Sequence, residues 1–180
     1  ESRGFQLDPA ALRRAVSPKS RALILNSPHN PTGAVVEERG LREIAEIART
    51  RDLIVFSDEA YATLTYDGLS FRSICSLDGM KERTVIIRTF SKTHAMTGWR
   101  VGFLAAPRVL AEKAAKFHEH TSACTSSVSQ AAALASFDVP KSTTAAMVRE
   151  YERRRDLLSA GLSRIPGLRV RKPGGAFYLF

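Results

Sequence analysis

Lys92 is the residue of this sequence best suited to covalent chemistry, because a lysine amine can form a Schiff base with an aldehyde. Hydroxyl side chains precede it at Thr89 and Ser91, and Arg100 follows eight residues later. Hydroxyls and a planar guanidinium can together bind a phosphate dianion. Segment 89–102 therefore predicts a loop that holds a phosphorylated aldehyde. Taken singly, Lys92 could be a surface lysine, and the two hydroxyls could serve only as turn or cap residues.

Two segments upstream of Lys92 carry further polar groups, and these are Asn30-Pro31-Thr32-Gly33 and Asp58-Glu59-Ala60-Tyr61. Taken singly, the first segment consists of ordinary turn residues. Asp58 could be a helix cap or an ion-pair partner, and Tyr61 a half-buried core residue. In an extended segment Glu59 points to the side opposite Asp58, so we assign Glu59 no chemistry.

The three polar segments each follow a short apolar run that predicts a buried strand, at residues 22–25, 53–56 and 84–87. Residues 37–51, between the first two runs, have one apolar face and predict a helix. This pattern is typical of a parallel α/β sheet, in which ligands bind at the carboxyl ends of strands. The three segments are therefore expected to form one site. Further elements are predicted at 10–16, 107–118 and 127–137 (helices) and at 101–105 (strand).

Together the three segments resemble the fold-type I, pyridoxal-phosphate-dependent aminotransferases of class I/II. The resemblance runs through nearly the whole chain, as far as Gly174-Gly175-Ala176-Phe177-Tyr178. It implies an enzyme that moves an α-amino group from an amino acid to a 2-oxo acid through a Schiff base between pyridoxal 5'-phosphate and Lys92. The freed amine of Lys92 would then move a proton between the substrate α-carbon and the cofactor.

The resemblance also implies cofactor contacts for the other polar residues. Asp58 would partner the pyridine nitrogen, and Asn30 and Tyr61 would donate to the phenolic oxygen. The phosphate contacts would come from Thr89, Ser91 and Arg100. The family usually has Ser or Gly where Thr89 stands, and threonine keeps the hydroxyl while adding a methyl group. Gly98 and Gly102 are expected to let the backbone pass close to the ligand.

The implied fold is a three-layer α/β/α domain with a mainly parallel sheet, present in part, followed by the start of a smaller α/β domain. Residues 1–140 would be the C-terminal half of the large, cofactor-binding domain. Residues 141–180 would be a long interdomain helix, predicted at 143–162, and the start of the small domain. Strands are predicted there at 168–170 and 176–180.

Composition argues against several other classes of protein. The net charge of +9 is spread over scattered basic residues, and the densest run, 153–155, lies among acidic neighbours, which is typical of a solvated helix face. Nucleic acid is therefore not an expected partner. No apolar run approaches the roughly 18–20 residues of a membrane span, and no secretory signal opens the chain. We expect a cytoplasmic protein that does not bind membranes.

The cysteine and histidine residues predict no metal site. Cys75 and Cys124 are far apart and have no metal-type spacing, and we expect them to be unpaired thiols. His118 and His120 diverge on a predicted helix, while His29 is expected to be a loop residue.

Both ends of the chain look like cuts through a larger protein, since Glu1 is no initiator and Phe180 ends within an apolar run. The resemblance implies a homodimer whose remaining site residues lie outside this segment, including the arginine that binds the substrate α-carboxylate. The isolated segment is therefore expected to be poorly stable and to have little activity. The motifs leave the amino donor open. They also leave open a β-lyase on the same cofactor and a non-catalytic, aminotransferase-like sensor domain of a transcription regulator.

Overall fold

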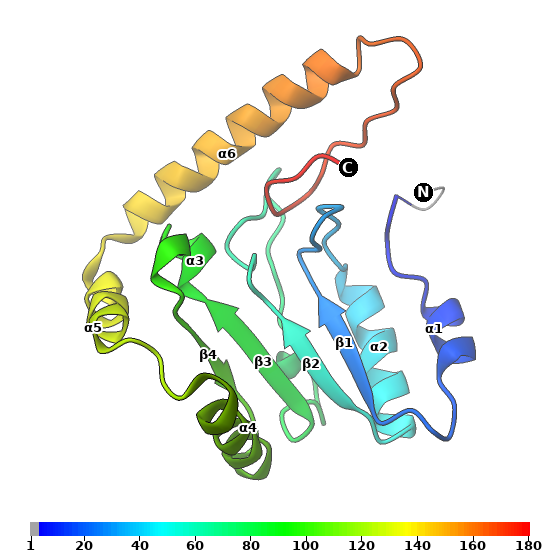
Figure 1. Ribbon diagram of the computed structural model, residues 1–180. Coiled ribbons are helices and arrows are strands. Elements are labelled where there is room, and N and C mark those ends of the chain that lie inside the picture. Colours follow the sequence, from blue (N-terminus) through cyan, green and yellow to red (C-terminus); the bar gives the residue numbers. More distant parts are fainter. Residues whose placement is uncertain (1–3) are drawn as a thin grey trace.

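The computed structural model describes residues 4–180, which form a sheet of four strands (Figure 1). The strands are β1 (Ala22–Asn26), β2 (Ile54–Asp58), β3 (Thr84–Thr89) and β4 (Gly102–Ala105). Their spatial order is β1-β2-β3-β4. The first three run parallel, whereas β4 pairs antiparallel with β3. The mainly parallel sheet predicted from the sequence is confirmed.

The helices are α1 (Pro9–Ala15), α2 (Glu38–Thr50), α3 (Phe90–Thr93), α4 (Arg108–Ser122), α5 (Ser127–Ala135) and α6 (Lys141–Leu162). In Figure 1, α6 runs across the top of the molecule, and the chain after it returns toward the carboxyl ends of the strands. Within residues 4–180, no helix combines the length and the apolar character needed to span a bilayer.

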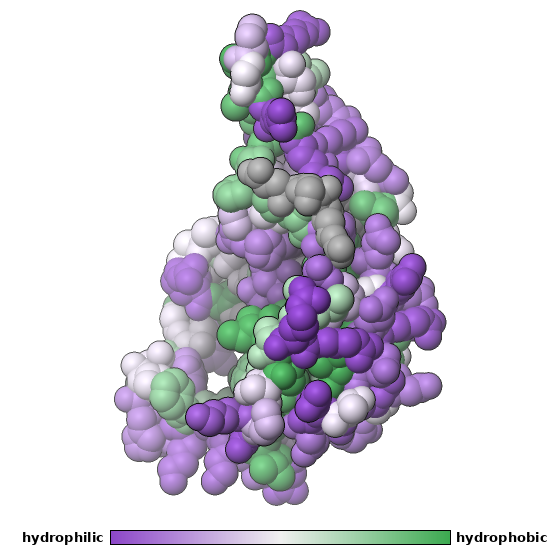
Figure 2. Space-filling model, turned by 90° about the vertical axis from the view of Figure 1, so that its right-hand side faces the viewer, coloured by the Kyte–Doolittle hydropathy of each residue, from purple (hydrophilic) through white to green (hydrophobic). Residues whose placement is uncertain are grey.

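Local sequence explains where the first helices begin and which face they bury. The Asp8 carboxylate accepts hydrogen bonds from the backbone of Ala10 and Ala11, and Pro9 occupies the first helical position of α1. The buried stripe of α2 consists of Leu41, Ile44, Ala45, Ile47 and Ala48. The outward faces are polar, so hydrophilic residues dominate the view from the α1 side (Figure 2).

The two faces of the sheet differ in how they are covered. Leu25 and Val55 point to one face, where they pack in a single buried cluster with the apolar stripe of α2. Ile24 and Ile87 point to the opposite face, because side chains alternate along a strand, and they are 78% and 40% exposed. We call this second side the open face of the sheet.

The C-terminal segment differs from the prediction. Residues 168–170 and 176–180 were expected to be strands, but the structure shows irregular backbone there and an isolated antiparallel bridge between Thr65 and Gly175. Ala176 is buried and Tyr178 partly buried by contact with loops and α6 instead of by pairing in a sheet, while Phe177 and Phe180 stay exposed. The prediction of strands was therefore wrong.

Residues 173–176 are held between two loops that precede them by a long stretch of sequence. The Gly175 amide donates to the Gly33 carbonyl at 2.9 Å, and the Ala176 amide donates to Leu64 at 2.9 Å. Arg155 of α6 is buried and donates to the Pro173 carbonyl at 3.1 Å. We call residues 173–176 the inserted segment. It joins the end of the chain to the carboxyl edge of the sheet.

Arg155 also makes an ion pair with Asp67, with 2.7 Å between Nη1 and Oδ2. The hydrogen bonds from Arg155, and then those from Lys172, lower the pKa of Asp67 below its usual range. Lys172 and Arg155 likewise lower the pKa of Asp156. These carboxylates therefore carry their charge at neutral pH and hold α6 and segment 172–173 together.

Substitution of Gly33 by alanine is expected to disrupt the inserted segment. Gly33 has φ +67°, and an added Cβ would lie 2.2 Å from Pro173 Cβ and 2.7 Å from the Gly175 oxygen. We expect a loss of about 3 kcal/mol in the free energy of unfolding, measured by urea titration of the full-length protein. Gly68→Ala is the matched control, because Gly68 has φ +73° with no neighbour within 4 Å. Equal losses in the two variants would contradict the packing argument.

Candidate functional site

The candidate site lies where β1, β2 and β3 end, on the open face of the sheet. Asn26 pairs with Asp58 in the register of the parallel strands, and Asp58 pairs with Ile87. Since alternate residues share a face, Asn26, Asp58 and Thr89 follow Ile24, Phe56 and Ile87 on that side. The sheet thus brings polar groups from three strands to one edge.

Asn26 connects the first loop to the second strand. Its amide nitrogen donates to the Asp58 carbonyl at 3.2 Å, and its side-chain oxygen accepts from the Asn30 backbone at 2.8 Å. Sequence reasoning missed this residue, which it treated only as the end of a strand. An amide side chain at a strand end, directly before a proline-rich turn, was the available signal.

Asp58 is half-buried, and its Oδ1 accepts from the backbone of Ala60 at 3.1 Å. Within residues 4–180, no ion pair involves this carboxylate, so the salt-bridge alternative left open by the sequence is not realised there. The Asp58 charge contributes to raising the pKa of the neighbouring Tyr61 phenol. Asp58 and Tyr61 are therefore electrostatic neighbours.

Glu59 points to the other side, as its position in an extended segment predicts. It is 2% exposed, and Arg88 donates to its Oε2 from Nε at 3.0 Å and from Nη2 at 2.7 Å. The hydroxyls of Ser57 and Ser73 donate to Oε1. This ion pair, with two donors on one carboxylate oxygen, joins the residue after β2 to β3, and it limits their relative movement.

Lys92 lies on α3, the short helix that follows β3. Thr89 caps this helix, since its Oγ1 accepts from the Ser91 backbone at 3.1 Å. The Lys92 Nζ lies 5.7 Å from the ring centre of Tyr61 and 5.2 Å from that of Phe177. Within residues 4–180, this amine forms no ion pair with a carboxylate. It is thus held by aromatic rings and remains available for reaction.

The hydroxyls of Thr89 and Ser91 lie together, with 2.8 Å between their oxygens. Thr89 thus has the capping role that the sequence left open, and its phosphate contact stays a prediction. Val101 lies beside them, because its carbonyl accepts from the Phe90 backbone at 3.2 Å. Arg100, which precedes Val101, is therefore near the start of α3.

Arg100 has left-handed backbone torsions, with φ 51° and ψ 48°. This conformation costs a non-glycine residue about 1–2 kcal/mol and is enriched at functional sites. Its guanidinium is exposed and donates to the Thr97 carbonyl at 3.1 Å. An added Cβ at Gly102 would lie 2.6 Å from the Arg88 oxygen, so this glycine is needed for the close pairing of β4 with β3. Gly98 has no neighbour within 4 Å. The expected passage of the two glycines close to the ligand stays a prediction.

Tyr61 is buried, and its hydroxyl forms a hydrogen bond with the hydroxyl of Tyr178. The nearby Asn30 side chain acts in the direction that lowers the pKa of the Tyr61 phenol. Burial first, and then Tyr178, raise the pKa of the Tyr61 phenol above its usual range. The phenol therefore stays protonated and can act as a donor. Tyr178 and Phe177 were missed as site residues, because they lie far along the chain in a run that was expected to be a strand.

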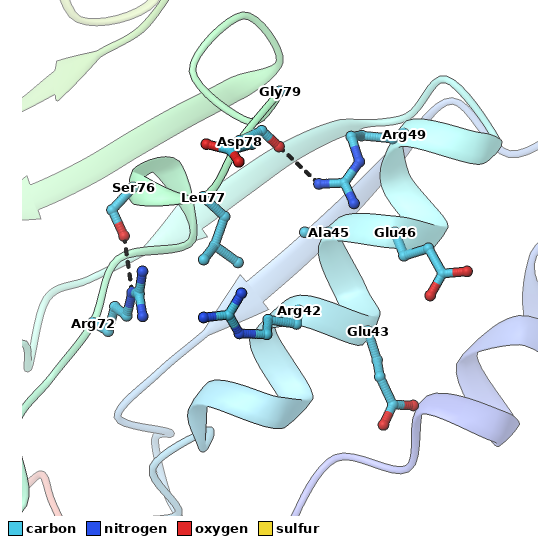
Figure 3. Close-up of a pocket in the computed structure, with 10 residues that line it drawn as sticks. All are labelled: Arg42, Glu43, Ala45, Glu46, Arg49, Arg72, Ser76, Leu77, Asp78 and Gly79. Atoms are coloured by element: carbon cyan, nitrogen blue, oxygen red, sulfur yellow. Dashed lines mark hydrogen bonds between the residues drawn. The ribbon is translucent and has the colours of Figure 1, made fainter.

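A cavity of about 720 Å³ lies away from this edge, between α2 and residues 72–79 (Figure 3). Its arginines already contact oxygens of the protein. Arg49 donates to the Asp78 carbonyl at 2.7 Å, and Arg72 donates to Ser76 Oγ at 3.2 Å. We assign no ligand to it. In the described range 4–180, no cluster of three or more acidic, histidine or cysteine side chains could hold a metal.

Four functional groups lie around one region at the carboxyl edge of the sheet. They are an amine without an ion-pair partner in residues 4–180, a carboxylate, a protonated phenol and an amide. The contacts described above bring together Lys92, Tyr61, Asn30 and Asp58, and they bring Thr89 next to Ser91. The backbone of Arg100 lies near Thr89 and Ser91, because the next residue, Val101, bonds to the start of α3. The Arg100 guanidinium forms no hydrogen bond with Thr89 or Ser91. Such a set can bind an aromatic aldehyde covalently and orient its ring substituents.

Comparison with known proteins gives a consistent result. The family described as aminotransferase class I and II matches residues 1–180. Aromatic-amino-acid aminotransferase 2 of Thermococcus litoralis is 48% identical over 182 residues, which cover 100% of this chain and 46% of that protein. An aspartate aminotransferase of Pyrococcus abyssi is 46% identical over 182 residues, with the same shares.

Solved structures agree with these relatives. The crystal structure of an aromatic aminotransferase from Pyrococcus horikoshii superposes with a TM-score of 0.94 at 44% identity, covering 99% of this chain and 48% of that one. The chain thus spans about half the length of the proteins that it matches.

Proposed function

Because the chain belongs to the family of class I and II aminotransferases, we propose that the full-length protein moves an α-amino group from an amino acid to a 2-oxo acid. The family uses pyridoxal 5'-phosphate, and Lys92 is the residue proposed to bind it covalently. The observation that best supports the proposal is the position of the Lys92 amine. The amine lies over the Tyr61 ring at the carboxyl edge of the sheet, where Asn30 and the end of β2 at Asp58 also lie.

The residues present fit this cofactor. When bound, it supplies an aromatic ring that accepts the electron pair released at the substrate α-carbon. Asp58 would keep the ring nitrogen protonated with its unpaired carboxylate. Tyr61 and Asn30 would donate to the ring oxygen, for which Tyr61 has a proton because its phenol pKa is raised.

The remaining groups would orient the cofactor and move protons. Thr89, Ser91 and Arg100 would bind the phosphate, with the guanidinium turning from the Thr97 carbonyl to the anion. The Lys92 Nζ would take a proton from the substrate α-carbon and return it at the cofactor carbon that Lys92 had occupied.

The domain division follows from the same family membership. We propose that residues 1–140 form the C-terminal half of the cofactor-binding domain and that 141–180 form the interdomain helix and the start of the small domain. The start of α6 at Lys141, directly after Pro140, supports this division. A homodimer and a cytoplasmic location stay predictions from the sequence and the family.

Product analysis tests the proposed reaction. We expect the purified full-length protein, given 2-oxoglutarate and aspartate, phenylalanine or tyrosine, to form glutamate and the matching keto acid in equal amounts. These donors are chosen because the relatives are named for aromatic amino acids and aspartate. Pyruvate and ammonia would instead indicate a β-lyase. Absence of all turnover, with a DNA-binding module upstream, would indicate a sensor domain.

A further inference from the structure

Tyr178 brings a hydroxyl into the candidate site from the far end of the chain. The inserted segment, residues 173–176, is bonded to the Gly33 and Leu64 carbonyls, so the residues directly after it are fixed against the site. The Tyr178 hydroxyl bonds with the Tyr61 hydroxyl, and the two rings meet edge to face at 5.7 Å and 72°. No other hydrogen bond of the Tyr178 hydroxyl is formed within residues 4–180.

The Tyr61 oxygen has a limited set of partners. A phenol has one proton to donate and two lone pairs that accept. In the contact between Tyr61 and Tyr178 either hydroxyl can be the donor. If Tyr61 gives its only proton to the ring oxygen of a cofactor, the contact with Tyr178 is kept only when Tyr178 donates to a lone pair of Tyr61.

We propose that Tyr178 is a positioning residue: its hydroxyl donates to Tyr61, and this directs the Tyr61 proton toward the ring oxygen of a cofactor bound at Lys92. This inference rests on the proposed function. The titratable groups that face Tyr61 are Asp58, Lys92 and Tyr178 itself. Burial keeps Tyr61 protonated, so it is a donor over the working pH range.

The proposal has a spectroscopic consequence. A donor to the ring oxygen stabilises negative charge there, so the cofactor bound at Lys92 loses its proton at a lower pH. Removal of the Tyr178 hydroxyl leaves the Tyr61 proton free to turn toward other acceptors. In Tyr178→Phe we therefore expect the pH midpoint of the visible absorption of the bound cofactor to rise by about half a unit.

Tyr66→Phe is the matched control. Tyr66 is also buried, and its hydroxyl donates to the Ala176 carbonyl of the inserted segment, but it does not contact Tyr61. Each variant loses one tyrosine hydroxyl that makes a hydrogen bond between the C-terminal segment and the rest of the protein. A merely structural role of Tyr178 predicts the same spectrum shift in both, whereas the proposal predicts a shift in Tyr178→Phe alone.

A double-mutant cycle completes the test in the full-length holoenzyme. With Tyr61→Phe already present, the Tyr178→Phe substitution is expected to shift the midpoint no further, because its effect passes through Tyr61. An unchanged midpoint in Tyr178→Phe, or an equal further shift in the Tyr61→Phe background, would overturn the inference. Failure of the proposed function is distinguishable, since the unsubstituted protein would then show no visible absorption that depends on Lys92.

Discussion

Replacement of Lys92 by alanine is expected to abolish both amino-group transfer and the visible absorption of the bound cofactor. The variant has no amine to form the covalent bond and none to move the proton. Loss of proton transfer alone lowers rates by about 10²–10⁴-fold, so we expect a loss of activity on the order of a thousandfold or more. Absorption spectra and the transfer assay measure the two effects. A band that survives the substitution would remove Lys92 from this role.

Lys113→Ala is the matched control for this experiment. Lys113 is exposed on α4, away from the carboxyl edge of the sheet, and the same atoms are removed. It should keep the spectrum and the activity. Both variants should unfold at nearly the same urea concentration, because the aromatic contacts of Lys92 are worth only about 0.5–1 kcal/mol.

Asp58→Asn is expected to lower kcat by on the order of 100- to 1000-fold while leaving the fold intact. Asparagine keeps the oxygen that accepts from the Ala60 backbone, so the turn is preserved. It loses the negative charge, and the ring nitrogen of the cofactor then no longer keeps its proton. Steady-state kinetics with saturated cofactor measures the effect. A kcat equal to that of the unsubstituted protein would exclude Asp58 as the partner of the ring nitrogen.

Glu59→Gln gives the contrasting result. Glu59 is the adjacent acid, but its carboxylate faces Arg88 on the covered side of the sheet. Loss of this charge should lower the free energy of unfolding, because the ion pair with Arg88 is lost. The kcat of the folded enzyme should change far less than in Asp58→Asn. The substitutions at these two neighbouring acids therefore separate effects on stability from effects on catalysis.

Much of the sheet could be predicted because its determinants are local. Short apolar runs marked β1, β2 and β3, and the apolar stripe at 37–51 marked α2. The alternation of side chains along a strand also placed Asp58 and Glu59 on opposite sides. The convergence of the three loops followed from one rule, that parallel strands end at a common edge.

The C-terminal part could not be predicted in this way, because its partners are remote. Residues 176–180 have the composition of a strand, yet the backbone at their start, at Gly175 and Ala176, bonds to the loops at Gly33 and Leu64. Nothing local distinguishes an apolar run that joins a sheet from one that inserts between loops. The contact between Tyr61 and Tyr178 depends on that insertion, and so does the position of Phe177 beside Lys92.

The bond between Gly33 and Gly175 also has a consequence for biosynthesis. The ribosome makes the Asn30–Gly33 turn well before Gly175, so the nascent chain carries an open turn until the inserted segment has been made. Sheet pairing among β1, β2 and β3 can precede this event, since those strands follow one another closely. Vitamin B6 would therefore meet this part of the pocket in its finished form only after the inserted segment has left the ribosome, and cofactor capture would follow that event.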